Sequence, residues 1–209
     1  MRLRIRFSKT ENMRFTGHLD LHRAWERIFR RAVLPIVYSQ GYHPQPRLNL
    51  ASALPLGFTS QDEVLDVWLD RQIPIPDVEA ALIQVLPPGI EIIKLEQVEE
   101  SLPSLQAIVK SLEYTVTLYE YKDSLDEQLA DLISSKSILR ERRGKTYDLR
   151  PLIEELTHIE DDPQGHNRLF MRLTAQSGAT GRPEEVLAEL QIPAETTHIH
   201  RTRVIFKDD

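Results

Sequence analysis

Three ionisable residues lie close together at the start of a predicted helix. His18, Asp20 and His22 fall within five consecutive positions. A His pair four residues apart on a helix can share one metal ion, as in zinc-binding helices. No residue nearby supplies a clear third ligand, and Asp20 points to another side of the helix. We therefore expect His18 or Asp20 to cap the helix, and we expect no metal site.

A second candidate site is a proline-rich segment that holds His43 together with Tyr38, Tyr42 and Arg47. A His beside Arg and Tyr can act as general acid or base on a phosphodiester without a metal. These residue types can equally stack on the bases of single-stranded RNA. A third reading is a rigid loop that packs Tyr42 and exposes His43. The sequence leaves catalysis by His43, Tyr42 and Arg47, ligand contact, and a purely structural loop open.

Basic residues are concentrated in the first fifty positions. This segment has ten basic and three acidic residues, whereas the remaining 159 residues have 16 basic and 29 acidic ones. Nine of the ten cations are Arg, which can bind phosphate or carboxylate through two parallel hydrogen bonds. A basic segment on an acidic body favours docking of an anion, such as RNA or an acidic protein surface. The alternative is a solvated helix face with a few structural ion pairs.

The arginines of the predicted helix share one face. Arg23, Arg27, Arg30 and Arg31 lie opposite the apolar side chains of residues 18–32, at spacings of three and four. Such a row can follow a phosphate backbone, unless carboxylates from the acidic second half pair with it. The candidate ligand-binding residues are cationic or aromatic: Lys9, Arg14, His18, Arg23, Arg27, Arg30, Arg31, Tyr38, Tyr42, His43 and Arg47.

Several classes of site are excluded by residue type. The chain has no Cys, so it has no disulfide, thiolate zinc site, iron–sulfur cluster or Cys nucleophile. It also lacks a phosphate-binding loop, a dinucleotide fingerprint and a nucleophile elbow. The start MRLRIRFSKT is not that of a signal peptide, and no apolar run approaches the roughly 20 residues of a membrane span. We expect a cytoplasmic protein without a cofactor or a membrane contact.

The pattern of the first half predicts alternating strands and helices. Period-two alternation over residues 2–7 predicts a half-buried strand with an arginine face. The connection 39–60 is long enough to be a functional loop or to contain a short strand near 48–51. The other predicted elements are a helix at 18–32, strands at 36–38 and 63–69, a helix at 75–86 and a strand at 90–98.

The second half repeats the order of elements without repeating the sequence. Residues 137–149 predict a strand or hairpin whose basic turn, Arg140, Arg142, Arg143 and Lys145, can form a second phosphate contact or a simple exposed turn. The sequence of residues 152–159 is compatible with either a helix or a strand. The remaining expectations are strands at 112–119, 169–175 and 197–206 and helices at 124–134 and 182–190. We predict an α+β fold with two tandem ferredoxin-like units, 1–103 and 104–209.

Several short motifs resemble those of a known family. They are F-S-K at 7–9, R-F-x-x-H-L-D at 14–20, Y-S-Q-G at 38–41, P-x-P-R at 44–47, A-L-P-L-G at 53–57, Y-D-L-R-P-L at 147–152 and R-P-E-E-V-L at 182–187. Together they resemble the radical-SAM-linked domain of unknown function, found next to or fused behind B12-binding radical SAM proteins in bacteria. The resemblance implies a radical SAM protein as partner and no established activity.

The resemblance has one departure that concerns the candidate site. The family loop runs G-F-N-P-H-P, whereas this chain has Gly41-Tyr42-His43-Pro44-Gln45-Pro46, so no role of a loop histidine carries over. Three hypotheses remain. The chain is an accessory module that contacts RNA, an adaptor that docks on the radical SAM partner without nucleic acid, or a small metal-independent enzyme that uses the 38–57 loop.

Overall fold

The computed structural model describes residues 1–142, 144–176 and 178–207, so Arg143 of the predicted basic turn lies outside the described residues. The chain divides into two compact units, Met1–Val109 (unit 1) and Lys110–Asp209 (unit 2), whereas the boundary expected from the sequence followed residue 103. Each unit combines helices with mostly antiparallel strands, which confirms the predicted α+β class.

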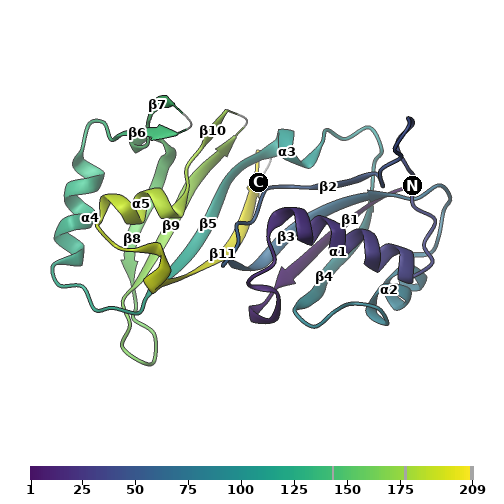
Figure 1. Ribbon diagram of the computed structural model, residues 1–209, viewed down its shortest axis with the longest axis horizontal. Coiled ribbons are helices and arrows are strands. Elements are labelled where there is room, and N and C mark those ends of the chain that lie inside the picture. Colours follow the sequence, from purple (N-terminus) through teal and green to yellow (C-terminus); the bar gives the residue numbers. More distant parts are fainter. Residues whose placement is uncertain (143, 177, 208–209) are drawn as a thin grey trace. The chain divides into compact units, whose positions relative to one another are not determined.

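Unit 1 has an antiparallel sheet with the strand order β4-β1-β3-β2. Figure 1 shows α1 lying across these strands. The elements are β1 (Arg2–Lys9), the 3₁₀ helix η1 (Glu11–Met13), α1 (His18–Arg31), β2 (Leu48–Leu50), β3 (Thr59–Trp68), α2 (Ile75–Ile83), β4 (Ile90–Val98) and α3 (Leu105–Ile108).

The sequence predicted the second strand of unit 1 at residues 36–38, but in the structure this strand lies later in the chain. The segment 36–38 makes only two isolated bridges, Ile36 to Leu69 and Tyr38 to Pro46, and is no regular strand. Instead β2 occupies the short apolar stretch within the long connection, where it pairs with β3. The structure thus confirms the predicted short strand near 48–51.

The core of unit 1 lies between its sheet and its helices. Alternation along β1 places Leu3, Ile5 and Phe7 on one face, where all three are fully buried. Trp25 of α1 packs edge-on against Phe7, with ring centroids 4.8 Å apart, and lies 5.5 Å from the ring of Phe29. This aromatic packing fixes which face of α1 is buried and therefore which face meets solvent.

Unit 2 has the strand order β8-β9-β5-β11, with the short β10 also paired to β9 and a separate hairpin of β6 and β7. The ambiguous segment 152–159 is a strand, because its backbone pairs with β9. The elements are β5 (Val109–Leu118), α4 (Leu125–Ser134), β6 (Leu139–Arg142), β7 (Lys145–Asp148), η2 (Arg150–Leu152), β8 (Ile153–Ile159), β9 (Arg168–Gln176), β10 (Ala179–Thr180), α5 (Pro183–Glu189), η3 (Ala194–Thr196) and β11 (Thr197–Phe206). Within the described residues, no helix is both long and apolar enough to cross a membrane.

Candidate anion-binding surface

The arginines of β1 are held by carboxylates of β3, because β1 and β3 pair antiparallel with Arg4 opposite Asp66. The buried carboxylate of Asp66 accepts hydrogen bonds from Arg2 and Arg4, with N–O distances of 2.6 to 3.0 Å. Arg6 pairs with Asp62 at 2.7 Å. The expected arginine face of β1 is therefore largely neutralised within unit 1 and contributes little to a basic surface.

Lys9 and Arg14 connect two loops of unit 1. The ammonium group of Lys9 is buried and donates to the carbonyls of Arg14 and Phe58, at 3.1 and 2.8 Å. The N–H of Gly57 donates to the carbonyl of Arg14, and Nε of the Arg14 guanidinium donates to the carbonyl of Gly57, both at 3.0 Å. The prediction that Lys9 contacts a ligand is wrong, because a fully buried ammonium group cannot reach one, and Arg14 is half-buried in a structural role.

The first turns of α1 do not form the expected cap or a metal pair. Gly17 is the N-cap, and no side chain makes a capping hydrogen bond there. Asp20 instead pairs with Arg23 at 3.3 Å, and Nδ1 of His22 lies 3.0 Å from Glu26. In the described part of the chain, no group of three or more His, Asp or Glu side chains is arranged to hold a metal ion. His22 is therefore engaged along its own helix.

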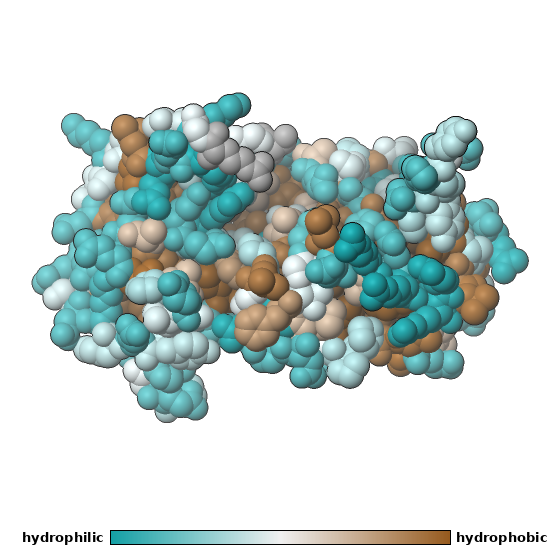
Figure 2. Space-filling model, viewed as in Figure 1, coloured by the Kyte–Doolittle hydropathy of each residue, from teal (hydrophilic) through white to brown (hydrophobic). Residues whose placement is uncertain are grey.

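Three arginines remain on the outer face of α1. Arg27, Arg30 and Arg31 are exposed, and none has a carboxylate partner among the residues that the structure describes. Arg30 and Arg31 lie in the last turn, where the partial negative charge of the helix end favours cations. Figure 2 shows hydrophilic surface over α1. These three side chains are the part of the predicted row that can bind an external anion.

Apolar side chains border this face near the start of α1. Phe15, Leu19 and Leu56 are 76%, 71% and 62% exposed. The mutual hydrogen bonds of Arg14 and Gly57 bring the segments of Phe15 and Leu56 side by side. Figure 2 shows hydrophobic surface beside the hydrophilic surface of α1. Sequence reasoning did not identify this patch, because Leu56 comes from a segment 37 positions after Leu19 and two apolar residues, Phe15 and Leu19, give no periodic signal by themselves.

The aromatic candidates lie on a hairpin that follows α1. Tyr42 at its tip is fully exposed, and its ring centroid lies 6.5 Å from that of His43. Arg47 at the base places its guanidinium carbon 4.1 Å from the ring centre of Trp68, which itself is buried. The pKa of Glu100 is lowered by the N-terminal ammonium group and, to a smaller extent, by the charge of Arg47. Tyr42 and His43 therefore lie together, whereas Arg47 is stacked on a tryptophan.

The basic turn of unit 2 is also paired internally. Arg140 and Arg142 of β6 contact Glu189 and Glu185, one helical turn apart on α5, at 2.6 and 2.5 Å. The hydrogen bond to Glu185 raises the pKa of Arg142, and burial raises that of Tyr147. These pairs hold the hairpin of β6 and β7 to α5, so a phosphate contact by Arg140 and Arg142 is not favoured.

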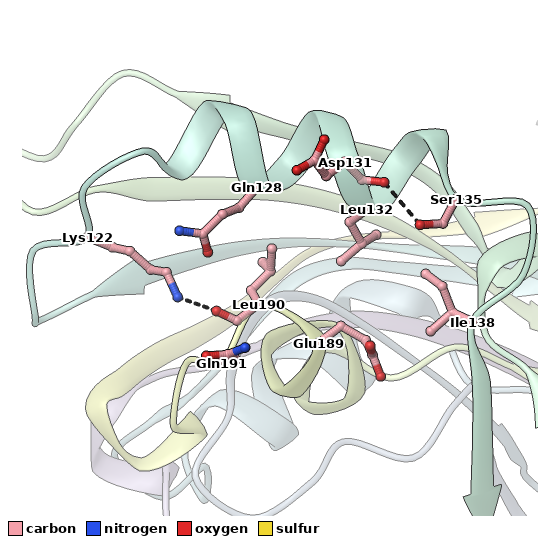
Figure 3. A pocket seen from close by; sticks show the side chains of 9 residues that line it. All are labelled: Lys122, Gln128, Asp131, Leu132, Ser135, Ile138, Glu189, Leu190 and Gln191. Carbon is pink, nitrogen blue, oxygen red and sulfur yellow. Dashed lines mark hydrogen bonds between the residues drawn. The ribbon is translucent and has the colours of Figure 1, made fainter.

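A cavity of about 430 Å³ in unit 2 lies between α4 and the end of α5. Figure 3 shows Lys122, Asp131 and Glu189 among the side chains that line it. The ammonium group of Lys122 donates to the carbonyl of Leu190, and Glu189 is paired with Arg140. Since two of its three charged groups already have partners inside unit 2, this cavity is a weaker candidate for anion binding than the face of α1.

Solved structures resemble the chain only distantly. The crystal structure of the archaeal box H/ACA sRNP Nop10–Cbf5 complex has 13% identity and a TM-score of 0.46, covering 99% of this chain and 49% of that one. An H/ACA RNP bound to a substrate RNA containing 2′-deoxyuridine has 9% identity, a TM-score of 0.43 and coverage of 88% and 43%. The chain thus spans about half the length of these two chains.

A third solved structure is similar over nearly its full length. The acetolactate synthase small subunit from Thermotoga maritima has 13% identity and a TM-score of 0.28, covering 98% of this chain and 94% of that one. No curated protein matches the chain. Likeness at these values carries no functional information.

A family model matches most of the sequence. It is described as an uncharacterized protein conserved in bacteria (DUF2344), and the match runs over residues 2–183. The match includes β1, α1 and the following hairpin, which carry the candidate surface. The chain therefore belongs to the bacterial family DUF2344.

Proposed function

We propose that the chain is an accessory binding module that docks RNA through the exposed arginines of α1. The observation that carries the proposal is that Arg27, Arg30 and Arg31 face solvent without a described carboxylate partner. The arginines of β1, in contrast, are neutralised by Asp62 and Asp66.

The charge of the surrounding sequence supports an anionic partner. No Asp or Glu occurs between Glu26 and Asp62, although the chain has 32 acidic residues. This interval contains the second half of α1, the hairpin and β2. Since like charges would repel phosphate, an interval with arginines and no carboxylates favours a polyanion such as RNA.

The fold we propose is two ferredoxin-like units in tandem. Unit 1 has the strand order β4-β1-β3-β2, and unit 2, read from its other edge, has β11-β5-β9-β8. In each unit this is the fourth, first, third and second strand along the chain, if the hairpin of β6 and β7 and the short β10 are taken as additions to unit 2. A fold of this kind serves many functions, so the RNA proposal rests on the arginines and not on the architecture.

Two triple variants test the proposal at matched charge. Arg27, Arg30 and Arg31 are changed to Ala in one, and the exposed Lys110, Lys136 and Arg203 of unit 2 in the other. Binding of fluorescently labelled total tRNA is measured by anisotropy at low salt. The proposal expects the first variant to lose at least tenfold in affinity and the second to bind like the parent chain. Equal affinities of both variants would refute it.

We further propose that the bound RNA is presented to a radical SAM protein. Support comes from the motif resemblance at 7–20, 38–57, 147–152 and 182–187, all within or overlapping the family match. The chain itself has no Cys to hold an iron–sulfur cluster, so the radical chemistry belongs to the partner. Co-purification of the two proteins, with and without ribonuclease, tests this association.

A second candidate function is an adaptor that docks on the radical SAM protein without RNA. The patch of Phe15, Leu19 and Leu56 favours it, because contiguous exposed apolar residues mark protein interfaces. Replacing Phe15 and Leu19 by Ser should weaken binding to the radical SAM protein and leave RNA binding unchanged. If only RNA binding responds, the patch is not the interface and the adaptor function fails.

A further inference from the structure

The hairpin after α1 is fixed at its base to the end of β3. The N–H of Val37 donates to the carbonyl of Trp68, and the N–H of Arg47 donates to the carbonyl of Val37, both at 2.8 Å. The N–H of Trp68 in turn donates to the carbonyl of Arg47 at 3.3 Å. The base of the hairpin is therefore part of the sheet's hydrogen-bond network.

The tip of the hairpin is held by its own contacts. The N–H of Ser39 donates to the carbonyl of Gln45 at 2.8 Å, and the N–H of Gln45 donates to the hydroxyl of Ser39 at 3.0 Å. Gly41 has a φ of 144°, a conformation that side chains disfavour. Two hydrogen bonds and a glycine that tolerates this backbone conformation therefore hold the turn in shape. Because the turn is already ordered, it loses less conformational entropy when it binds a ligand.

This ordered tip presents an aromatic ring to solvent. Tyr42 is 101% exposed, and the ring of His43 lies beside it in edge-to-face geometry. A tyrosine usually buries a large part of its surface in a folded protein, at a gain of free energy. A ring left wholly in water on a braced turn is therefore suited to stack on a partner's flat surface.

A second flat surface lies at the base of the same hairpin. The guanidinium carbon of Arg47 lies 4.1 Å from the ring centre of Trp68, and Arg47 is exposed on its other side. Arginine planes stack on nucleobases while their N–H groups reach phosphate. Because Arg47 is five positions after Tyr42, the Cα atoms of the two residues are at most about 18 Å apart, which a short nucleic acid strand can span.

We infer that this hairpin, residues 37–47, stacks unpaired bases, which makes single-stranded RNA the preferred ligand. The inference rests on the proposed function, since the arginines of α1 would hold the phosphates. In a duplex the bases are stacked on one another, so no base face is accessible for stacking on Tyr42 or Arg47. The hairpin thus supplies the selectivity for unpaired RNA that a row of arginines alone does not have.

Two labelled strands of equal charge separate stacking from phosphate binding. One is a 12-nucleotide oligouridine, and the other is the same backbone with abasic sites throughout. The parent chain should bind oligouridine more tightly. Tyr42→Ala should weaken binding of oligouridine by about 5- to 150-fold, the range for one stacked base, and leave binding of the abasic strand unchanged. Tyr42→Phe should bind like the parent chain, because stacking needs the ring and not the hydroxyl.

A matched control is Tyr121→Ala, which removes an exposed tyrosine of unit 2 and should change neither affinity. If the parent chain binds both strands equally, or if Tyr42→Ala has no effect on oligouridine, the stacking inference is wrong while RNA docking by α1 stands. If the parent chain binds neither strand at low salt, the proposed function itself is wrong and the inference falls with it.

Discussion

Arg2 and Asp66 form an ion pair in the interior of unit 1, with Nη2 and Oδ2 2.6 Å apart and both side chains inaccessible to solvent. Arg2 also donates to the carbonyls of Leu102 and Pro103, which ties the segment before α3 to the sheet. Arg4 shares the same carboxylate. One buried acid thus neutralises two of the ten basic residues that make the N-terminal segment look uniformly cationic.

Removing this carboxylate should destabilise the fold strongly. Asp66→Ala leaves Arg2 buried without a counter-charge, which costs about 3–5 kcal/mol in the free energy of unfolding. The exposed pair of Asp20 and Arg23 provides the control, and Asp20→Ala should change stability by at most about 1 kcal/mol. Urea unfolding of both variants measures the two values. If Asp66→Ala and Asp20→Ala lowered the free energy of unfolding by the same small amount, Asp66 would not be the centre of a buried ion pair.

Arg47→Ala should uncover Trp68. The tryptophan is buried while Arg47 lies over its ring, and Trp25 is in the core, so both indoles of the parent chain are shielded from water. Truncation of Arg47 should shift the fluorescence emission maximum to longer wavelength and increase quenching by acrylamide. Arg71→Ala, which removes another exposed arginine of unit 1, serves as control and should leave the spectrum unchanged. An identical spectrum for Arg47→Ala would contradict the stacking geometry.

Asp148 should contribute to stability in a pH-dependent way. The N–H groups of Ile138 and Arg150 donate to its carboxylate at 2.8 and 3.0 Å and hold its pKa below the usual value. An unfolded Asp has a pKa of about 3.9, so the stabilisation is fully present above about pH 4 and is lost as pH falls through the lower folded value. The stability difference between the parent chain and Asp148→Ala should therefore narrow in strong acid.

Urea titrations of both proteins from neutral to acidic pH measure this difference. A gap in unfolding free energy that stays constant down to pH 2 would show that the charge of Asp148 contributes nothing.

Gly89→Ala should disturb the loop that precedes α1. A methyl group at Gly89 would lie 2.7 Å from Cγ of Met13 and 3.0 Å from its backbone nitrogen, and φ is 97°. Backbone strain and the clash together should cost about 1–3 kcal/mol. Gly17→Ala, where nothing lies within 4 Å and φ is −74°, should cost at most about 1 kcal/mol, because only the weaker N-cap preference of Ala changes there. Thermal unfolding of the two variants checks the contrast, and equal midpoints would contradict it.

Local pattern was enough to predict the elements that carry the surface. The apolar spacing of α1 identified its buried face, and with it the exposed positions of Arg27, Arg30 and Arg31. Alternation along β1 identified Leu3, Ile5 and Phe7 as core residues. In both cases one face of a regular element is buried, and the period of the side chains reports that face directly.

Pairing between distant residues could not be predicted in the same way. Asp66 reaches Arg2 from 64 positions away, and the register of β1 against β3 decides which acid meets which arginine. The signal that was available was an acid inside the apolar stretch 63–69, since such a residue is seldom buried without a partner. The burial of Lys9 likewise depends on a loop near Phe58 that has no periodicity.

The salt dependence of RNA binding tests the central claim most directly. For a single strand, log K falls with log salt by about 0.7 for each phosphate contact. If Arg27, Arg30 and Arg31 each contact a phosphate, their joint replacement by Ala should reduce the slope by about 2, while replacement of Lys110, Lys136 and Arg203 should leave it unchanged. Parallel salt slopes for the parent chain and the arginine variant would show that α1 does not bind the RNA backbone.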